Sequence, residues 1–313
     1  MKYTILGAGG SIGNALTYEL LKTKEDVRLV SRSNYSIPGT ESFIADLTSY
    51  DETLKSVQNS DIVYLCAGLP YDSKVWADLW PKVMQNSINA CKSVNARLIF
   101  FDNVYMYGKV DGKMTEATPY NPCSIKGAVR ANIVMNLENE IKNKNINAII
   151  ARSADLYGPY ATKTSVPFIL VFDKLMHGKK AQWMINANKV HSLTNTIDAA
   201  KGMVLLSQNN ECFNQTWHLP TCNPPVDGES FIRLVAEELG VQPDYKILKR
   251  WMLRLAGIFN KTISESYEML YQSEFDYFFD STKFNNYFNY SPKHYSAGIY
   301  ETIEFFKQKN HFN

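Results

Sequence analysis

Residues 1–13 read MKYTILGAGGSIG, and this stretch determines how the rest of the chain is organised. Its first half, Lys2 to Leu6, is a short run of residues typical of a β-strand. Three glycines follow at intervals of three residues: Gly7, Gly10 and Gly13. From Ser11 onward the apolar residues recur at helical spacing, with Ile12 and Leu16 on one face. The stretch therefore predicts a strand that turns through glycines directly into a helix.

A strand, a glycine turn and a helix in this order are suited to binding a phosphate group. Glycines allow a tight turn and a close approach of the backbone, and a helix N-terminus offers free N–H groups with a partial positive charge. Because the glycines lie between a strand and a helix, the motif favours dinucleotide binding over a purely structural turn. We predict that five residues bind the diphosphate of the cofactor: Gly7, Gly10, Ser11, Ile12 and Gly13.

The second expected strand, residues 26–32, indicates which form of the cofactor is bound. Its end lies ~20 residues past the glycines, where a dinucleotide fold places the residue that contacts the adenosine ribose. An acid there would bind the ribose hydroxyls of NAD, but this chain has Ser31 followed by Arg32. A guanidinium pairs well with a 2′-phosphate. The sequence therefore favours NADP(H), with NAD as the alternative.

Strand-like and helix-like segments alternate as far as Arg152. The expected strands are residues 26–32, 42–45, 61–68, 97–101 and 147–152, and the expected long helices are residues 75–94 and 126–144. This alternation predicts an α/β fold with a Rossmann-type, doubly wound parallel sheet, which binds ligands at the carboxyl ends of its strands. Ala67 and Gly68, at the end of strand 61–68, should let the backbone approach the cofactor.

The alternation stops after Arg152. Residues 155–159 predict a turn, residues 166–176 and 196–206 predict helices, and residues 217–219 predict a strand that returns to the sheet. A mainly helical tail follows residue 223, and in it Thr262 and Glu265 match a capping box, which is typical of a helix start. We expect an NAD(P)-binding domain at residues 1–155 with return segments around residues 188–220. Residues 156–187 and 221–313 should form a smaller, mainly helical substrate lobe.

The composition of the chain excludes several classes of function. Its 313 residues are 45% hydrophobic and 20% charged with a net charge of +2, and no basic run indicates a nucleic-acid partner. Five cysteines form no CxxC pair and no metal spacing with the five histidines, which predicts reduced thiols, a cytoplasmic protein and no metal. The longest apolar run, residues 166–172, is too short to span a bilayer, and no signal peptide precedes the first strand. We therefore expect no membrane partner.

Several motifs taken together resemble the extended short-chain dehydrogenase/reductases, specifically the NAD-dependent epimerase/dehydratase family. The matching motifs are GAGGSIG (7–13), Asp46-Leu47, residues 65–68, Tyr107-Gly108, Lys126, Arg152, residues 157–159 and residues 198–200, with residues 279–283 and 301–303 in the tail. The resemblance covers nearly the whole chain. It implies a Rossmann domain with a smaller substrate lobe and a nicotinamide cofactor, and it adds Asp46 and Lys126 to the expected cofactor-binding residues.

The departures from the family pattern lie at the expected active site. Asn103 stands where the family has a Ser or Thr, and Pro122 stands where it has the Tyr that precedes the lysine. Lys126 is kept, but both hydroxyl groups that act on the substrate carbonyl are absent. A phenol beside an ammonium is a suitable acid for hydride transfer to a carbonyl. Four tyrosines fall on loops at the expected ligand edge: Tyr105, Tyr107, Tyr120 and Tyr157.

From these departures we predict a catalytic set of Asn103, Tyr105 and Lys126, in which the amide of Asn103 donates to a carbonyl oxygen. The resemblance also indicates two substrate positions. Asp155 stands where the family commonly has an Asn that contacts a sugar nucleotide, and His191 stands where it commonly has an Arg that pairs the diphosphate. Finally, the resemblance implies a homodimer through helix 126–144, although the apolar face of that helix fits burial on its own sheet equally well.

Three functions fit the sequence. The first, which we favour, is an NAD(P)-dependent oxidoreductase of the epimerase/dehydratase type, NADP(H)-dependent, that acts on a small carbonyl or hydroxyl substrate. The second is an NAD-dependent sugar-nucleotide epimerase or dehydratase. The third is a non-catalytic NADP(H)-binding sensor or regulator, because the usual catalytic tyrosine is absent. The sequence does not identify the substrate.

Overall fold

The computed structural model describes residues 1–162 and 164–310. The chain divides into two compact units, each made of several segments. The first unit comprises Met1–Met106, Ile125–Arg152 and Ala200–Trp217. The second comprises Tyr107–Ser124, Ser153–Ala199 and His218–Asn313, of which the last three residues lie outside the described part.

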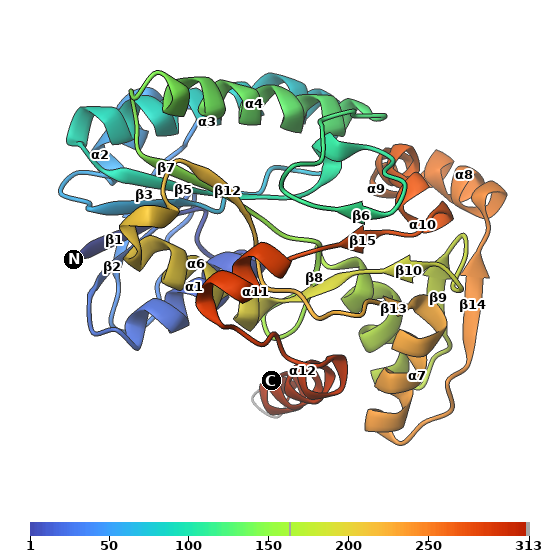
Figure 1. Ribbon diagram of the computed structural model, residues 1–313. Coiled ribbons are helices and arrows are strands. Elements are labelled where there is room, and N and C mark those ends of the chain that lie inside the picture. Colours follow the sequence, from blue (N-terminus) through green and yellow to red (C-terminus); the bar gives the residue numbers. More distant parts are fainter. Residues whose placement is uncertain (163, 311–313) are drawn as a thin grey trace. The chain divides into compact units, whose positions relative to one another are not determined.

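The first unit is built on a seven-stranded sheet with the order β12-β7-β5-β4-β1-β2-β3 (Figure 1). Its strands are β1 (Lys2–Leu6), β2 (Asp26–Ser31), β3 (Glu41–Ile44), β4 (Ile62–Leu65), β5 (Arg97–Asp102), β7 (Ala148–Arg152) and β12 (Gln215–His218). The pairings from β3 across to β7 are parallel. This arrangement confirms the predicted Rossmann-type, doubly wound α/β fold.

Helices cover both faces of this sheet, as Figure 1 shows for α2, α3 and α4 on one face and α1 and α6 on the other. Their bounds are α1 (Ser11–Leu21), α2 (Tyr50–Ser56), α3 (Ser73–Val94), α4 (Ile125–Lys142) and α6 (Thr196–Gln208), with short 3₁₀ turns at Tyr105–Tyr107 and Asn210–Cys212. The central strands are therefore buried on both faces, and every residue of β4 and β7 is inaccessible to solvent. Their continuous apolar sequences follow from that burial.

Helix α4 packs along α3 within the chain. Lys92 of α3 pairs with Glu140 of α4 at 2.8 Å, and the amide of Asn136 donates to Gln85 at 3.1 Å. Three apolar residues of α4, Ile133, Val134 and Leu137, are at most 2% exposed in the single chain, whereas Met135 is 45% exposed. Most of the apolar face that suggested a dimer is thus already buried, and the homodimer stays a prediction.

The second unit combines helices with pairs of short strands. The strand pairs are β8 (Asp155–Tyr157) with β11 (Leu193–Asn195), β9 (Ala181–Met184) with β14 (Tyr245–Leu248), β6 (Lys113–Met114) with β15 (Phe278–Phe279), all parallel, and β10 (Val190–His191) with β13 (Val226–Asp227), antiparallel. The helices are α5 (Asp173–Met176), α7 (Gly228–Leu239), α8 (Arg250–Phe259), α9 (Lys261–Ser266), α10 (Tyr271–Glu274), α11 (Thr282–Phe288) and α12 (Tyr295–Asn310), with a π-helical turn at Phe168–Phe172 and a 3₁₀ turn at Tyr267–Met269. A core of aromatic and aliphatic side chains, including Phe172, Phe231 and Ile299, holds these elements together.

Two local predictions in this unit are wrong. Residues 155–157 form strand β8 rather than a turn, because their backbone pairs with β11. The capping box at Thr262 and Glu265 does not start a helix, because α9 already begins at Lys261 and the side chain of Asn260 accepts the N–H of Ile263 at 3.2 Å. The other predicted elements named above agree with the structure to within about three residues at their ends. Among the described residues, none of the helices has the length and apolar character that crossing a membrane requires.

Candidate functional site

The loop after β1 has a backbone conformation that requires glycine. Gly7 has a φ of +96°, and a β-carbon on it would lie 2.3 Å from the Cα of Ala67. The N–H groups of Gly7 and Ala8 both donate to the carbonyl of Val30, at 2.9 and 3.0 Å. Strand β1 lies between β2 and β4, so the loops that follow β1 and β4 diverge to opposite sides. Such a switch point is where doubly wound sheets bind their ligands.

The loops after β1 and β4 have open space where a diphosphate would lie. A β-carbon on Gly10 would meet no atom closer than 3.8 Å, and one on Gly68 would meet none within 4 Å. Gly10 is the N-cap of α1 and makes no side-chain cap hydrogen bond, so the first turn of the helix keeps N–H groups for a ligand. Gly13 instead lies close to the loop, since its β-carbon would be 3.0 Å from the carbonyl oxygen of Gly7. The residues present therefore fit a dinucleotide diphosphate.

The expected adenosine end of the site carries Arg32 and Asp46. Arg32 is exposed directly after β2. Asp46 accepts hydrogen bonds from the backbone N–H and the hydroxyl of Thr48, both at 2.9 Å, and these bonds together with the charge of Arg32 lower the pKa of its carboxyl. Glu41, the first residue of the neighbouring strand β3, pairs with Lys2 at 2.8 Å and with Arg28 at 3.0 Å. It is thus engaged elsewhere, and a guanidinium, not a carboxylate, follows β2.

The predicted catalytic residues form two contacts within the first unit. The side-chain oxygen of Asn103 accepts the backbone N–H of Tyr105 at 3.0 Å, and the Tyr105 ring stacks on Trp76 at 6.2 Å. Lys126 is fully buried, and its ammonium lies 4.5 Å from the centroid of the Tyr71 ring. The carboxyl-end loops of β4 and β5 and the start of α4 therefore supply two phenols, an amide and an ammonium.

Two of the other candidate tyrosines serve the second unit's structure. Tyr107 is buried, and its hydroxyl hydrogen-bonds to Nε2 of His218 at 2.8 Å. Tyr157 is 1% exposed within the aromatic core, and burial raises its pKa well above the usual range. Tyr120 lies beside Tyr107, with the ring centroids 6.0 Å apart. Neither Tyr107 nor Tyr157 is suited to donate a proton to a ligand.

The sequence analysis missed Tyr71 and a buried ion triad. Asp102, the last residue of β5, lies between Arg130 of α4 and Arg152 of β7. Nε of Arg130 is 2.9 Å and Nε of Arg152 is 3.3 Å from the carboxylate, and all three side chains are at most 4% exposed. The triad fixes the strand end that continues into Asn103. Tyr71 was detectable in principle, because it follows β4 at the edge where ligands bind.

In the second unit, the structure brings the predicted substrate residues Asp155 and His191 into contact. Nε2 of His191 is 2.9 Å from the Asp155 carboxylate, and the imidazole stacks on Tyr277 with the ring centroids 4.5 Å apart. His191 is 7% exposed, whereas the Asp155 side chain is 29% exposed. Asp155 and His191, which both differ from the family pattern, therefore contact each other.

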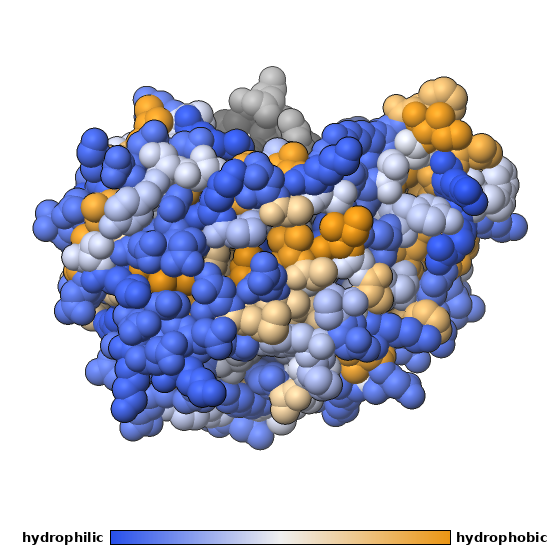
Figure 2. All heavy atoms as spheres, turned by 90° about the horizontal axis from the view of Figure 1, so that it is seen from above, coloured by the Kyte–Doolittle hydropathy of each residue, from blue (hydrophilic) through white to orange (hydrophobic). Residues whose placement is uncertain are grey.

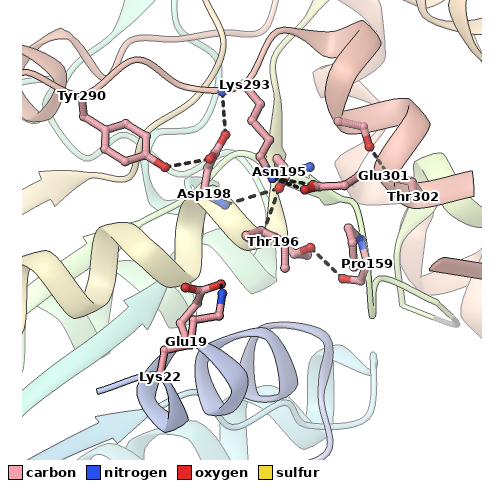
Figure 3. Close-up of polar contacts among 12 residues, drawn as sticks. Glu19, Lys22, Pro159, Asn195, Thr196, Asp198, Tyr290, Lys293, Glu301 and Thr302 are labelled. Atoms are coloured by element: carbon pink, nitrogen blue, oxygen red, sulfur yellow. Dashed lines mark hydrogen bonds and ion pairs between the residues drawn. The ribbon is translucent and has the colours of Figure 1, made fainter. Parts of the chain in front are cut away.

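Asp198, which begins the Asp-Ala-Ala motif, has a structural role (Figure 3). Its buried carboxylate accepts the hydroxyl of Tyr290 at 2.7 Å and the backbone N–H of Lys293 at 2.8 Å. The ammonium of Lys293 pairs in turn with Glu301 of α12. These bonds attach the segment before α12 to the start of α6, so this motif stabilises the tail of the second unit.

Comparison with solved structures finds the same architecture in sugar-nucleotide enzymes. A UDP-glucuronic acid 4-epimerase of Bacillus cereus in complex with NAD superposes with a TM-score of 0.81 at 18% identity, over 99% of each chain. A dTDP-glucose 4,6-dehydratase of Streptomyces venezuelae, also with NAD, gives a TM-score of 0.80 at 15% identity, over 100% of this chain and 98% of that one. A UDP-glucose 4-epimerase of Thermus thermophilus with NAD gives 0.80 at 16% identity, over 98% and 99%. At these identities the likeness establishes the fold.

No curated protein sequence matches the chain. A family model, however, matches residues 3–216, which contain the glycine loop, nearly all of the seven-stranded sheet and the strand ends described above. On this match, the chain belongs to the NAD dependent epimerase/dehydratase family.

Proposed function

We propose that this protein binds a nicotinamide dinucleotide at the loops after β1 and β4 and is an oxidoreductase of the epimerase/dehydratase type that acts on a carbonyl or hydroxyl substrate. The observation that supports this most is the approach of Gly7 to Ala67, because a side chain at residue 7 would collide with the β4 loop. Open space at Gly10 and Gly68 and the uncapped start of α1 match a bound diphosphate.

The form of the cofactor follows from the end of β2. Arg32 is exposed there and influences Asp46, while Glu41 is held by Lys2 and Arg28. A guanidinium directly after β2, at the position where an acid would bind the ribose hydroxyls of NAD, favours a 2′-phosphate. We therefore propose NADP(H) as the preferred cofactor. NAD is the alternative, and it is the form held by the three solved structures compared above.

The bound cofactor would supply or accept the hydride, and residues of the chain would donate or accept the proton. In this proposal Lys126 would hold the nicotinamide ribose and stabilise a phenolate beside it. Tyr71, whose ring lies 4.5 Å from that ammonium, and Tyr105, which is bonded to the Asn103 turn, are the two candidate proton donors. The side-chain oxygen of Asn103 accepts the backbone N–H of Tyr105. The side-chain N–H₂ of Asn103 would then donate to a carbonyl oxygen of the substrate.

A second candidate is a sugar-nucleotide epimerase or dehydratase, and the Asp155–His191 contact favours it in part. If the two side chains are charged oppositely, the pair adds no net charge to a pocket that has to accept a diphosphate. With a neutral imidazole, the pair leaves one negative charge that repels the same ligand. Titration with uridine-diphosphate and thymidine-diphosphate sugars separates the two candidates.

The cofactor assignment is tested by Ser11→Glu. A carboxylate in the first turn of α1 suits the helix dipole but repels a diphosphate, so the variant should fold normally and bind NADPH at least tenfold more weakly. Ser296→Glu, in the first turn of α12, is the matched control and should bind like the wild type. Fluorescence titration with NADPH and NADH gives the affinities. Unchanged binding by Ser11→Glu would contradict the proposed site, and binding without turnover of any carbonyl compound would favour the sensor function.

A further inference from the structure

Helix α8 presents an apolar face to solvent. Its side chains Trp251, Leu255, Ile258 and Phe259 are 60%, 53%, 72% and 91% exposed. Their spacing of four, three and one residues puts them on one side of the helix. Leu253, on the opposite side, is 8% exposed, and Gly257 lies against Ser264 of the following helix, α9. The helix is thus fixed to its own unit by one side and is uncovered on the other.

The segment around this face is rich in positive charge, although Asp244 and Glu265 border it directly. Residues 245–264 contain five cations and no aspartate or glutamate. All five are exposed: Lys246, Lys249, Arg250, Arg254 and Lys261. Arg250 is paired with Glu274, so the cations relevant to a partner are Lys246, Lys249 and Arg254. Orange spheres gather at the upper right of Figure 2, on the side where α8 lies in Figure 1, beside blue hydrophilic residues.

We infer that α8 docks the protein on an anionic phospholipid surface, with Trp251, Leu255, Ile258 and Phe259 inserted at the level of the headgroups. Apolar side chains that include Trp and Phe, flanked by Lys and Arg, are the pattern of helices that lie in a membrane interface. Ten residues make a helix of about 15 Å, which can lie in the interface but cannot cross a bilayer.

Charge complementarity decides between this occupant and a second copy of the chain. A two-fold contact would bring the same patch on both copies together and would oppose two cationic segments. Anionic headgroups instead neutralise those cations while the acyl region receives the apolar side chains. The sequence analysis expected no membrane partner because no run could span a bilayer. Surface docking needs no span, and the face that carries it exists only once α8 has formed.

Vesicle binding tests the inference on the full chain. The wild type should co-sediment with phosphatidylcholine vesicles that contain phosphatidylserine, should not bind vesicles of phosphatidylcholine alone, and should be released by salt. Trp251 gives a second readout, because the other four tryptophans are at most 8% exposed and its emission should shift to the blue on insertion. Equal binding to both vesicle types, or binding to neither, would overturn the proposal.

Two variants assign the binding to α8. The double variant Ile258→Glu, Phe259→Glu should lower vesicle affinity at least tenfold, and Lys249→Glu with Arg254→Glu should do the same. The control Ile44→Glu, at a residue that is 58% exposed on β3, should bind vesicles normally. Circular dichroism and NADPH binding verify that each variant is folded. If the α8 variants keep their vesicle affinity, or if they abolish a self-association seen by sedimentation without vesicles, α8 is not a lipid-docking helix.

Discussion

The ammonium of Lys126 lies 4.5 Å from the centre of the Tyr71 ring, although the two residues come from different elements of the first unit. Lys126 is the second residue of α4, and Tyr71 lies between β4 and α3. In this chain Pro122 occupies the position of the tyrosine that the family places before the lysine. The contact therefore brings the aromatic ring of a different tyrosine next to the ammonium.

If Tyr71 is the proton donor, Tyr71→Phe should lower kcat at least a hundredfold and leave the KM for NADPH nearly unchanged, since general acid catalysis contributes about 10²–10⁴-fold. Tyr105→Phe is the matched variant, because its ring stacks on Trp76 and survives the loss of the hydroxyl. Turnover of NADPH with a panel of carbonyl compounds gives the rates. A large loss in Tyr105→Phe alone would transfer the role to Tyr105.

Arg32→Ala should weaken NADPH binding tenfold or more and leave NADH binding nearly unchanged. The reason is the loss of a charge-assisted contact with the 2′-phosphate, which is worth ~1.5–3 kcal/mol. Lys55→Ala removes an exposed cation of the same unit and should affect neither cofactor. Calorimetric titration with both cofactors measures the two affinities. If the wild-type protein binds NADH as tightly as NADPH, the proposed preference for NADPH is wrong.

Asp102→Asn should destabilise the protein by about 3–5 kcal/mol, because it leaves Arg130 and Arg152 buried without their shared carboxylate. The control is Asp78→Asn in α3, where an exposed pair with Lys82 at 2.7 Å is lost. Exposed pairs of this kind contribute about 0–1 kcal/mol. Urea unfolding of the two variants at neutral pH should show this contrast, and equal midpoints would mean that the triad contributes little to stability.

Glu116→Gln should stabilise the protein at about pH 7 and have little effect near pH 4. Burial raises the pKa of the Glu116 carboxyl, although the backbone N–H of His218 donates to it at 2.9 Å. Between the ordinary pKa and the raised one, the folded chain binds more protons than the unfolded chain, so stability falls as the pH rises through that interval. Glutamine keeps the acceptor for His218 and cannot ionise.

Thermal melts at the two pH values measure this effect. Glu237→Gln, at an exposed residue of α7, is the control and should melt like the wild type at both. If the melting temperature of Glu116→Gln rises equally at low and neutral pH, the added stability comes from packing and not from the removal of a charge.

The parts of the fold that local patterns encode were predictable from the sequence. The loop from Gly7 to Gly13 follows from a strand, three glycines and a helix in consecutive residues, and the buried strands follow from their apolar runs. The start of α9 was predicted from a capping-box match at Thr262, whereas the cap is Asn260, two residues earlier, and only the backbone geometry identifies it. Strand β8 was missed because its partner, β11, is distant in sequence.

The contacts of the candidate site were less predictable. Asp102, Arg130 and Arg152 meet only when β5, α4 and β7 pack together, and no spacing rule relates them. The same holds for Tyr71 with Lys126 and for Asp155 with His191. The sequence analysis considered Asp155 and His191 as two separate substitutions that each weaken diphosphate binding. In the structure the two side chains contact each other. The charge of that pair depends on a proton that the sequence could not assign.

Asp155→Asn decides whether this pair excludes nucleoside-diphosphate sugars. At an effective dielectric of ~20, one unfavourable charge ~4 Å from a phosphate costs about 4 kcal/mol before solvent relaxation, and a third of that is a tenfold penalty. If the Asp155 carboxylate repels the diphosphate, the variant should bind uridine-diphosphate sugars at least tenfold more tightly than the wild type in calorimetry at about pH 7.5. Asp173→Asn, at a partly exposed acid of α5, is the control and should leave the affinity unchanged. Micromolar binding by the wild type, with no gain in Asp155→Asn, would mean that His191 already neutralises the carboxylate, and it would favour the sugar-nucleotide function over the small carbonyl substrate.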